Sequence, residues 1–339
     1  MLPDHKYFYS KLALQNVSEE DYNHAQTVWK EFNCSNMLDY TRIYVISDTV
    51  LLAEVIQTFR RKIHNEFKLD PVHFVSLPAL AKDIMLKTSR CSLDMIHESN
   101  MCYFFKSGIR GGLSYVNTRK ACIDELEKKT GEKYTILYLD ANNLYGCSMS
   151  RPLPVGGYRW LTQDEIQSFD FQKISFESVK GYAFEVTLEY PEHLHIDHNS
   201  FPLAAEHVTV EEDMLSPYAS SCLSELGMNF SRTKKLTATF GTRSRYVCHG
   251  MNLKLYLELG LKLKEVHSGV EFTQGCFMKK FVDICAKKRR EAVTKMDSMI
   301  YKKLVNSVFG KVSFNTMCMC VHIYIYIYIY IYMFLCFYV

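Results

Sequence analysis

Asp140 stands where a short apolar run meets a turn. In the stretch YLDANNLYG (138–146), the apolar residues 136–139 lead to Asp140, a turn of small and amide residues follows, and Tyr145 comes directly after it. The apolar run predicts a buried strand over 134–140. A carboxylate at the end of a buried strand usually has a chemical role. We therefore expect Asp140 to be functional and look for its partners elsewhere in the chain.

A second set of suitable residues lies on one face of a predicted helix. At about 100° per residue, Lys302, Asn306 and Phe309 share one stripe. The opposite stripe, which should pack inward, is apolar: Ile300, Leu304 and Val308. The helix before it carries further cations: Lys287, Lys288, Arg289 and Arg290. Such a face suits the phosphates of a triphosphate and a base; the alternative is a solvated pair of basic helices.

These residues must be positioned by a mixture of helices and strands. Residues 1–100 have mostly helical periodicity, with a helix capped by Ser18 and another from Asp48 onward. Paired glycines in 108–117 indicate a tight turn, and the charged residues 119–133 a solvated connection.

From Tyr134 onward the pattern alternates between strands and helices. The final helix should have Asp297 as its N-cap and Gly310 just past its end. Besides the strand at Asp140, the predicted elements are a strand over 181–190, a helix from 252 to about Gly260, a strand over 264–272, and helices over 277–295 and 297–309.

Composition limits the class of protein. With 339 residues, 48% of them hydrophobic, the chain can form about two domains with real cores, and disorder throughout is excluded. The net charge is +3, but residues 279–311 hold ten Lys and Arg against three Asp and Glu, which is +7 and leaves −4 for the remainder. A basic segment of this kind suggests nucleic acid or nucleotide phosphate as partner.

The cysteines and the two ends of the sequence indicate in which cellular compartment the protein is expected. Twelve scattered cysteines without a C-x-x-C pair, and no secretion-signal pattern at the start, predict reduced thiols inside a cell. Residues 317–339 are apolar enough for a membrane span, and their Ile/Tyr alternation also resembles an aggregating strand. An ATAT repeat in DNA encodes the same alternation. We favour this third interpretation, expect no membrane contact, and leave the tail out of the fold.

Two motifs resemble those of a known family. KKLVNSVFGK (302–311) is similar to K-x-x-x-N-S-x-Y-G, motif B of family B DNA polymerases, and YLDANNLYG resembles their motif A, D-x-x-S-L-Y-P. In motif A, Asn143 and Gly146 stand at the Ser and Pro positions. The order and the long interval are similar to the protein-primed branch, and most similar to polymerases of Maverick or Polinton transposons. The resemblance covers roughly residues 5–316.

The first third of the chain fits the same resemblance. YVISD is similar to the third exonuclease motif, Y-x-x-x-D, with Tyr44 and Asp48 in the matching places; Asp48 could equally be a helix N-cap. IRGG resembles the Y-x-G-G linker that contacts the template strand, so Arg110, Gly111 and Gly112 are candidate DNA-binding residues. Ile109 replaces the aromatic residue, so stacking there is lost, whereas Arg110 could still contact a phosphate.

The resemblance implies an α+β fold that begins with the end of an RNase H-like exonuclease domain and continues into an incomplete polymerase palm with two-helix fingers. The implied domains are an exonuclease-like part (1–107), a linker with the IRGG turn (108–133), a palm with motif A and an insertion (134–276), fingers with motif B (277–316) and the low-complexity tail (317–339).

For chemistry, the resemblance implies DNA-directed DNA polymerisation with two Mg²⁺ ions about 3.5–4 Å apart. Asp140 would be a catalytic metal ligand, and backbone N–H groups in the turn behind it, Ala141 to Leu144 with Asn143 among them, would hold the triphosphate. Tyr145 would lie under the sugar and select deoxynucleotides; outside the motif it would be taken for a core tyrosine.

On the fingers, Lys302 would neutralise phosphate charge, assisted by Arg290 or Lys287. Asn306, Phe309 and Gly310 would line the nascent base pair. The implied partners are primer-template DNA and dNTP, with a terminal protein as a candidate primer, and the implied location is the nucleus.

One requirement of two-metal chemistry is missing from the sequence. The family takes its second carboxylate from a Y-x-D-T-D motif C after motif B, whereas this sequence contains no D-x-D. The first two exonuclease motifs are absent as well. We therefore expect a fragment that neither polymerises nor proofreads by itself, because losing one metal-bridging carboxylate lowers the rate by orders of magnitude. A palm without motif C strands would also leave an unpaired edge, so unstable folding is a further alternative.

Three other interpretations remain open. A non-catalytic nucleic-acid-binding remnant would use the basic helices and the IRGG turn. A membrane-tethered protein would require the tail to be real. His193, His195, His198 and His207 could form a zinc cluster, but their spacing matches no structural zinc pattern, and a polar loop is the simpler interpretation.

Overall fold

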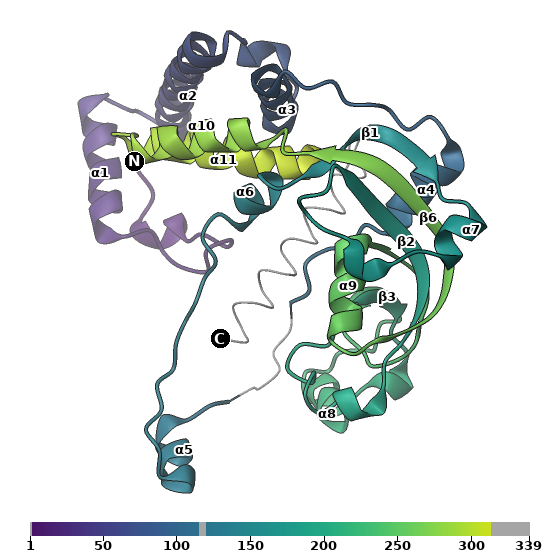
Figure 1. Cartoon of the computed structure of the whole chain (residues 1–339). Helices are drawn as coiled ribbons and strands as arrows, with labels where there is room; N and C mark the ends of the chain where they lie inside the picture. Colours follow the sequence, from purple (N-terminus) through teal and green to yellow (C-terminus); the bar gives the residue numbers. More distant parts are fainter. Residues whose placement is uncertain (1, 115–119, 313–339) are drawn as a thin grey trace. The chain divides into compact units, whose positions relative to one another are not determined.

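The computed structural model describes residues 2–114 and 120–312. They fall into two compact units, of which the first ends at Val75 and the second begins at Ser76 (Figure 1). Helices and strands are both present, so the mixed α+β class is confirmed. The predicted tail lies outside the described residues, and the predicted domain boundaries stay predictions. In the described part of the chain, no helix is long and apolar enough to cross a membrane.

The first unit is helical, as predicted. Ser18 caps its first long helix, because its Oγ accepts a hydrogen bond from the backbone N–H of Asp21 (3.1 Å). Its elements are η1 (His5–Phe8), α1 (Glu19–Glu31), α2 (Met37–Phe67) and η2 (Pro71–His73).

Helix α2 begins earlier than predicted. Asn36 is its N-cap, with Oδ1 accepting from the N–H of Asp39 (3.1 Å). Asp48 therefore lies in the helix interior, and the alternative that it caps a helix is wrong. The amide side chain of Asn36 satisfies one of the first free N–H groups, so the helix starts there.

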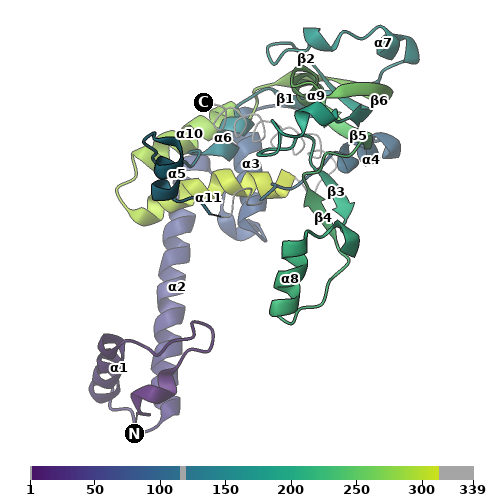
Figure 2. The same ribbon diagram turned by 90° about the horizontal axis from the view of Figure 1, so that it is seen from below.

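The second unit contains a group of four helices that pack on one another (Figure 2). On the longest of them, Leu304 and Val308 are buried and Ile300 is half-buried, so the predicted inward stripe is confirmed. The helices are α3 (Leu77–Ser89), α6 (Leu144–Met149), α10 (Lys279–Arg290) and α11 (Lys295–Val312).

Both predicted ends of α11 are wrong. Asp297 lies inside the helix, where its N–H donates to Oγ1 of Thr294 (3.1 Å), so the threonine hydroxyl acts as the cap. The helix continues to Val312 and contains Gly310. A glycine ends a helix only where the chain turns away, and here the chain does not.

A four-stranded antiparallel sheet, in the order β1-β6-β2-β5, forms the rest of the second unit's core. The strands predicted over 181–190 and 264–272 are confirmed as β2 and β6; β1 and β5 were not predicted. Phe184 lies beside Cys248 on one neighbouring strand and Gly269 on the other. The strands are β1 (Leu153–Trp160), β2 (Lys180–Glu189), β5 (Arg243–His249) and β6 (Lys262–Gly275).

Helices cover the two faces of this sheet. The predicted helix α9 (Gly250–Glu258) packs on the face that carries Phe184, Val186 and Leu188. Helix α4 (Ser99–Ser107) packs through aromatic edges: Phe104 meets Trp160 with ring centroids 5.3 Å apart, and Phe105 meets Tyr158 at 6.0 Å. Short elements complete the unit: α5 (Ile123–Thr130), α7 (Gln163–Gln167), η3 (Phe171–Lys173) and η4 (Glu192–Leu194).

The chain segment between β2 and β5, called the excursion below, contains a small second sheet in which β3 pairs antiparallel with β4. Arg243 fixes its base. This guanidinium is 1% exposed, donates to the carbonyls of Ala204 (2.7 Å) and Gly241 (2.6 Å), and pairs with Glu206 (3.0 Å). The elements are β3 (Glu206–Thr209), η5 (Glu212–Met214), α8 (Pro217–Glu225) and β4 (Lys234–Thr237).

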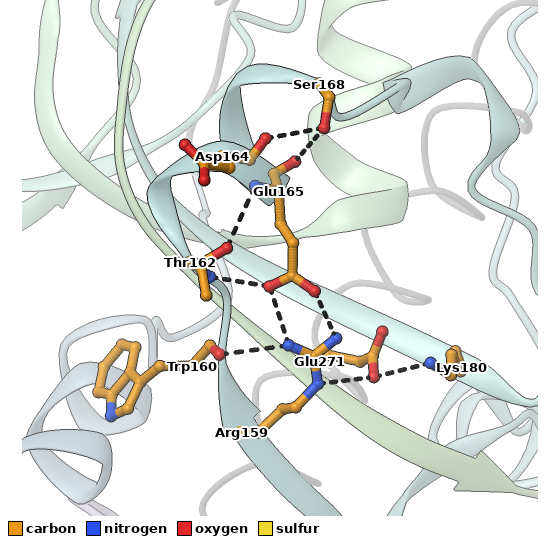
Figure 3. A network of polar contacts seen from close by, with 8 residues as sticks. All are labelled: Arg159, Trp160, Thr162, Asp164, Glu165, Ser168, Lys180 and Glu271. Carbon is orange, nitrogen blue, oxygen red and sulfur yellow. Dashed lines mark hydrogen bonds and ion pairs between the residues drawn. The ribbon is translucent and has the colours of Figure 1, made fainter.

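A polar network joins β1, β2 and β6 (Figure 3). Arg159 binds Glu165 with two hydrogen bonds of 2.9 Å, and its Nε donates to Glu271 (3.1 Å), which also accepts from Lys180 (2.9 Å). Burial alone would raise the pKa of Glu271, but the hydrogen bonds from Lys180 and Arg159 outweigh it and hold the pKa below its usual value. The Arg159 hydrogen bonds lower the pKa of Glu165 to about 2.

The strand predicted over 134–140 is not a strand in the structure. The segment has no regular secondary structure, and Ile136, Leu137, Tyr138 and Leu139 are all exposed. A strand needs a neighbouring backbone to satisfy its N–H and C=O groups. None of the described strands pairs with this segment, so the apolar pattern alone does not make it a strand.

Candidate nucleotide-binding site

A cavity of about 300 Å³ lies among α6, α10 and α11. Three residues predicted to bind nucleotide, Asn143, Arg290 and Lys302, line it together although they are far apart in the sequence. The remaining lining residues are Val282, Cys285, Ala286, Arg289, Ser298, Tyr301 and Val305. Of these, the sequence indicated only Arg289, as part of the basic run 287–290. The others lie on the same helix faces as predicted residues, and the helical spacing could have indicated them.

The cavity wall is cationic. Arg289 and Arg290 occupy the last turn of α10, and Lys302 is exposed on α11. The described lining contains no carboxylate, while Ser298 and Tyr301 add hydroxyl groups. Guanidinium, ammonium and hydroxyl donors around an uncharged floor suit the oxygens of an anion such as phosphate.

Asn143 enters the cavity from a special backbone position. It has φ 54°, in the left-handed region that asparagine tolerates, and forms the N-cap of α6. A Cβ built on Gly146 would lie 2.3 Å from Asn143 Nδ2, so the glycine leaves room for this side chain. Leu144 begins α6 and is half-buried, which anchors the turn.

Two aromatic rings connect α6 to α11. Tyr145 and Phe309 are stacked, with centroids 4.4 Å apart and an interplanar angle of 29°. Tyr145 is 38% exposed, so it is not an ordinary core tyrosine. Asn306 is exposed one turn before Phe309. The structure thus brings the predicted sugar-side and base-side rings into contact; their roles stay predictions.

Asp140 does not have the neighbours that a metal site needs. It is exposed in a segment without regular structure, three residues before the α6 cap. Within the described ranges, no group of three or more His, Cys, Asp or Glu side chains could hold a metal ion. A single exposed carboxylate does not form a two-metal centre, so the residues present do not fit such a centre by themselves.

The other predicted residues lie elsewhere. Arg110 is half-buried against β5, and Gly111 and Gly112 are exposed beside it. Tyr44 and Asp48 are one helical turn apart on α2 of the first unit, both exposed. The Tyr44 hydroxyl donates to the Asp48 carboxylate, and this hydrogen bond raises the pKa of Tyr44.

Two of the four histidines considered as zinc ligands pack as ring side chains, whereas His193 and His207 are exposed. His195 stacks on Phe240 (centroids 4.4 Å apart, 14°), and His198 Nδ1 is hydrogen-bonded to the Tyr190 hydroxyl (2.7 Å). Burial lowers the pKa of His198 below its usual value, because it disfavours the charged ring. The pair therefore belongs to an aromatic cluster on the sheet, whereas a polar loop was predicted.

Among solved structures, the phi29 DNA polymerase complexed with primer-template DNA and incoming nucleotide has 15% sequence identity and a TM-score of 0.44, covering 74% of this chain and 38% of that chain. The phi29 polymerase complexed with single-stranded DNA has 15% identity and a TM-score of 0.40, covering 75% and 37%. The chain thus spans well under half of the polymerase that it matches.

No curated protein matches the chain. A family model does, over residues 3–323. Because this match covers nearly all of the 339 residues, the chain belongs to the family described as DNA polymerase type B, organellar and viral.

Proposed function

We propose that this chain is the nucleotide-binding and DNA-binding part of a DNA-directed DNA polymerase, which adds deoxynucleotides to a primer 3′-hydroxyl. The convergence of Asn143, Arg290 and Lys302 on one cationic cavity carries the proposal. Motif A supplies Asn143, motif B supplies Lys302, and the helix before motif B, α10, supplies Arg290. An anionic ligand with a flat base fits the chemistry of the cavity and of the rings beside it.

In this proposal the phosphates of a dNTP lie against the cations. Lys302 and Arg290 donate charge-assisted hydrogen bonds to phosphate oxygens. Backbone N–H groups at Asn143 and Leu144 add neutral donors, since the first N–H groups of a helix have no partner within it. The orientation of the ligand follows, because its anionic end is held between α6, α10 and α11.

The base and sugar would lie toward the aromatic pair. Tyr145 would contact the sugar and exclude a 2′-hydroxyl by steric clash. Asn306 and Phe309 would line the base pair, with Gly310 leaving space for its edge. The stack of Tyr145 on Phe309 supports this assignment, because it places the proposed sugar-side ring directly beside the proposed base-side ring. A base can stack on an aromatic ring of this kind.

Family B polymerases use Mg²⁺, and Asp140 is the proposed ligand of this chain. When bound, the metal would supply charge stabilisation to the phosphates, but the described residues contain no group of three or more side chains that could hold it. The finer assignment to protein-primed polymerases of Maverick or Polinton transposons, acting in the nucleus with a terminal-protein primer, rests on the motif spacing. The exonuclease-like part (1–107), linker (108–133), palm (134–276) and fingers (277–316) are proposed on the same basis.

A second candidate function is a non-catalytic nucleic-acid-binding remnant. The finding that no group of three or more potential metal ligands occurs among the described residues favours it, because binding needs the cations but not a metal centre. A primer-extension assay with Mg²⁺, together with a salt-dependent DNA gel shift, distinguishes the two. Extension that Asp140→Ala abolishes would establish a working polymerase. A gel shift without incorporation would establish the remnant, and neither activity would refute both.

A further inference from the structure

The side chain of Arg110 is engaged by strand β5. Its Nη1 donates to the carbonyl of Val247 (2.7 Å) and to that of Gly108 (3.1 Å). Its Cζ lies 3.8 Å from the centroid of the Tyr246 ring. Carbonyl acceptors and an aromatic face together hold a guanidinium in one orientation, because the planar group satisfies both at once.

Tyr246 carries this contact into the core. The ring is 5% exposed, and its hydroxyl donates to the carbonyl of Ala205 (3.1 Å), directly before β3. Burial and the nearby Arg110 charge lower the pKa of His207 on β3, in agreement with this proximity. Arg110 thus connects the segment after α4 to β5 and to the base of the excursion.

The two residues after Arg110 have the opposite environment. Gly111 and Gly112 are exposed, and a Cβ added to either would meet nothing within 4 Å. The backbone of both residues therefore lies at the surface with open space beside the Cα atoms. Backbone N–H groups without side chains can approach phosphate oxygens closely and supply neutral donors.

We propose that Arg110 is a positioning residue. It fastens the segment 108–112 to β5 through Tyr246 and Val247, so that the peptide groups of Gly111 and Gly112, rather than the Arg110 guanidinium, face a nucleic-acid phosphate. The anchoring stands on the contacts above, and the phosphate partner rests on the proposed function. The Nη1 donors of Arg110 go to the carbonyls of Gly108 and Val247, and one face of its guanidinium lies on Tyr246, so the group is held at β5.

A lysine substitution at Arg110 distinguishes the anchoring role of the side chain from the effect of its positive charge. Arg110→Lys keeps the positive charge, which serves a phosphate contact, but loses the planar group that stacks on Tyr246 while donating to Val247. Arg110→Gln removes both. Arg232→Gln is the matched control, since Arg232 is an exposed cation of the same unit that pairs with Glu211 and does not touch the segment.

Hydrogen exchange of the full chain, read by mass spectrometry on peptides covering 105–114, tests the anchor without DNA. We expect roughly tenfold faster exchange in Arg110→Gln, and nearly as much in Arg110→Lys, with no change in Arg232→Gln. Unchanged exchange in both Arg110 variants, or full restoration by lysine, would overturn the proposal. If Arg110→Gln does not fold by circular dichroism, Arg110→Lys alone decides.

The salt dependence of DNA binding tests the second part of the proposal, that the peptide groups of Gly111 and Gly112, and not Arg110, face the phosphate. We expect Arg110→Gln to bind DNA more weakly with an unchanged slope of log K against log salt. A slope lower in magnitude by about one would mean that Arg110 itself contacts a phosphate, and would overturn the proposal. Absence of DNA binding by the wild-type chain would refute the proposed function and the phosphate partner, whereas the exchange result would still decide the anchor.

Discussion

Replacing His249 by asparagine should remove much of the acid sensitivity of the fold. His249 is 1% exposed and is the N-cap of α9, where its Nδ1 accepts from the N–H of Met251 (3.0 Å). This acceptor exists only when Nδ1 carries no proton. Asparagine places Oδ1 near the same position and is a good N-cap, so His249→Asn keeps the cap and loses the titration.

The magnitude follows from linkage between protonation and folding. Burial lowers the pKa of His249 from 6.5 to about 3 in the folded chain, so the unfolded chain binds the proton first. The contribution to stability is complete above the unfolded pKa and is lost as the pH falls toward the folded one. At about 1.4 kcal/mol per pH unit, the wild type should lose at most roughly 3 kcal/mol through this residue between pH 6.5 and 4.

Urea unfolding followed by circular dichroism at pH 7, 6, 5 and 4 measures this difference. Other titrating groups, His198 among them, are common to both proteins and cancel in the comparison. His249→Asn should be uniformly less stable, because the smaller side chain leaves a gap, but its stability should depend less on pH below pH 6.5. Parallel curves for the two proteins would refute the assignment of a buried, neutral His249.

Two further predictions concern the sheet. Glu271→Gln should lower the free energy of unfolding by about 1–3 kcal/mol, because Arg159 and Lys180 lose a nearly buried common partner. Glu165→Gln, at a more accessible carboxylate, should lower it less. Equal losses of unfolding free energy, measured by urea unfolding, would contradict this. Gly181→Ala should lower the melting temperature, since its Cβ would lie 2.1 Å from a ring carbon of buried Phe272 and overpacking costs about 1–3 kcal/mol. Gly275→Ala, with its nearest neighbour at 3.8 Å, is the control and should melt with the wild type.

Helix faces were predictable because spacing within one helix decides which side chains lie together. Lys302, Asn306 and Phe309 recur at helical intervals, and the buried stripe opposite them was confirmed. The packing of α11 on α3 was not predictable, since no local pattern says which helix covers a given stripe. The cavity therefore contains predicted residues of α10 and α11 together with neighbours that only the packing reveals.

Strands were less predictable because their partners are distant in sequence. β1 contains Pro154, Gly156 and Gly157, which disfavour a strand locally. It forms because β6 pairs with it and because the Asp94 carboxylate accepts from the N–H of Gly157 (2.8 Å). The segment 134–140 shows the converse, a strong strand pattern that has no partner among the described strands.

The dissociation constant of the full chain for a dNTP tests the central claim most directly. We predict that the wild type binds dATP with magnesium, that Lys302→Ala weakens binding about tenfold or more through loss of a charge-assisted hydrogen bond, and that Lys303→Ala changes it less than about twofold. Lys303 is the matched control, an exposed cation on the same helix outside the cavity. Equal effects of the two substitutions, or no binding by the wild type, would contradict the account.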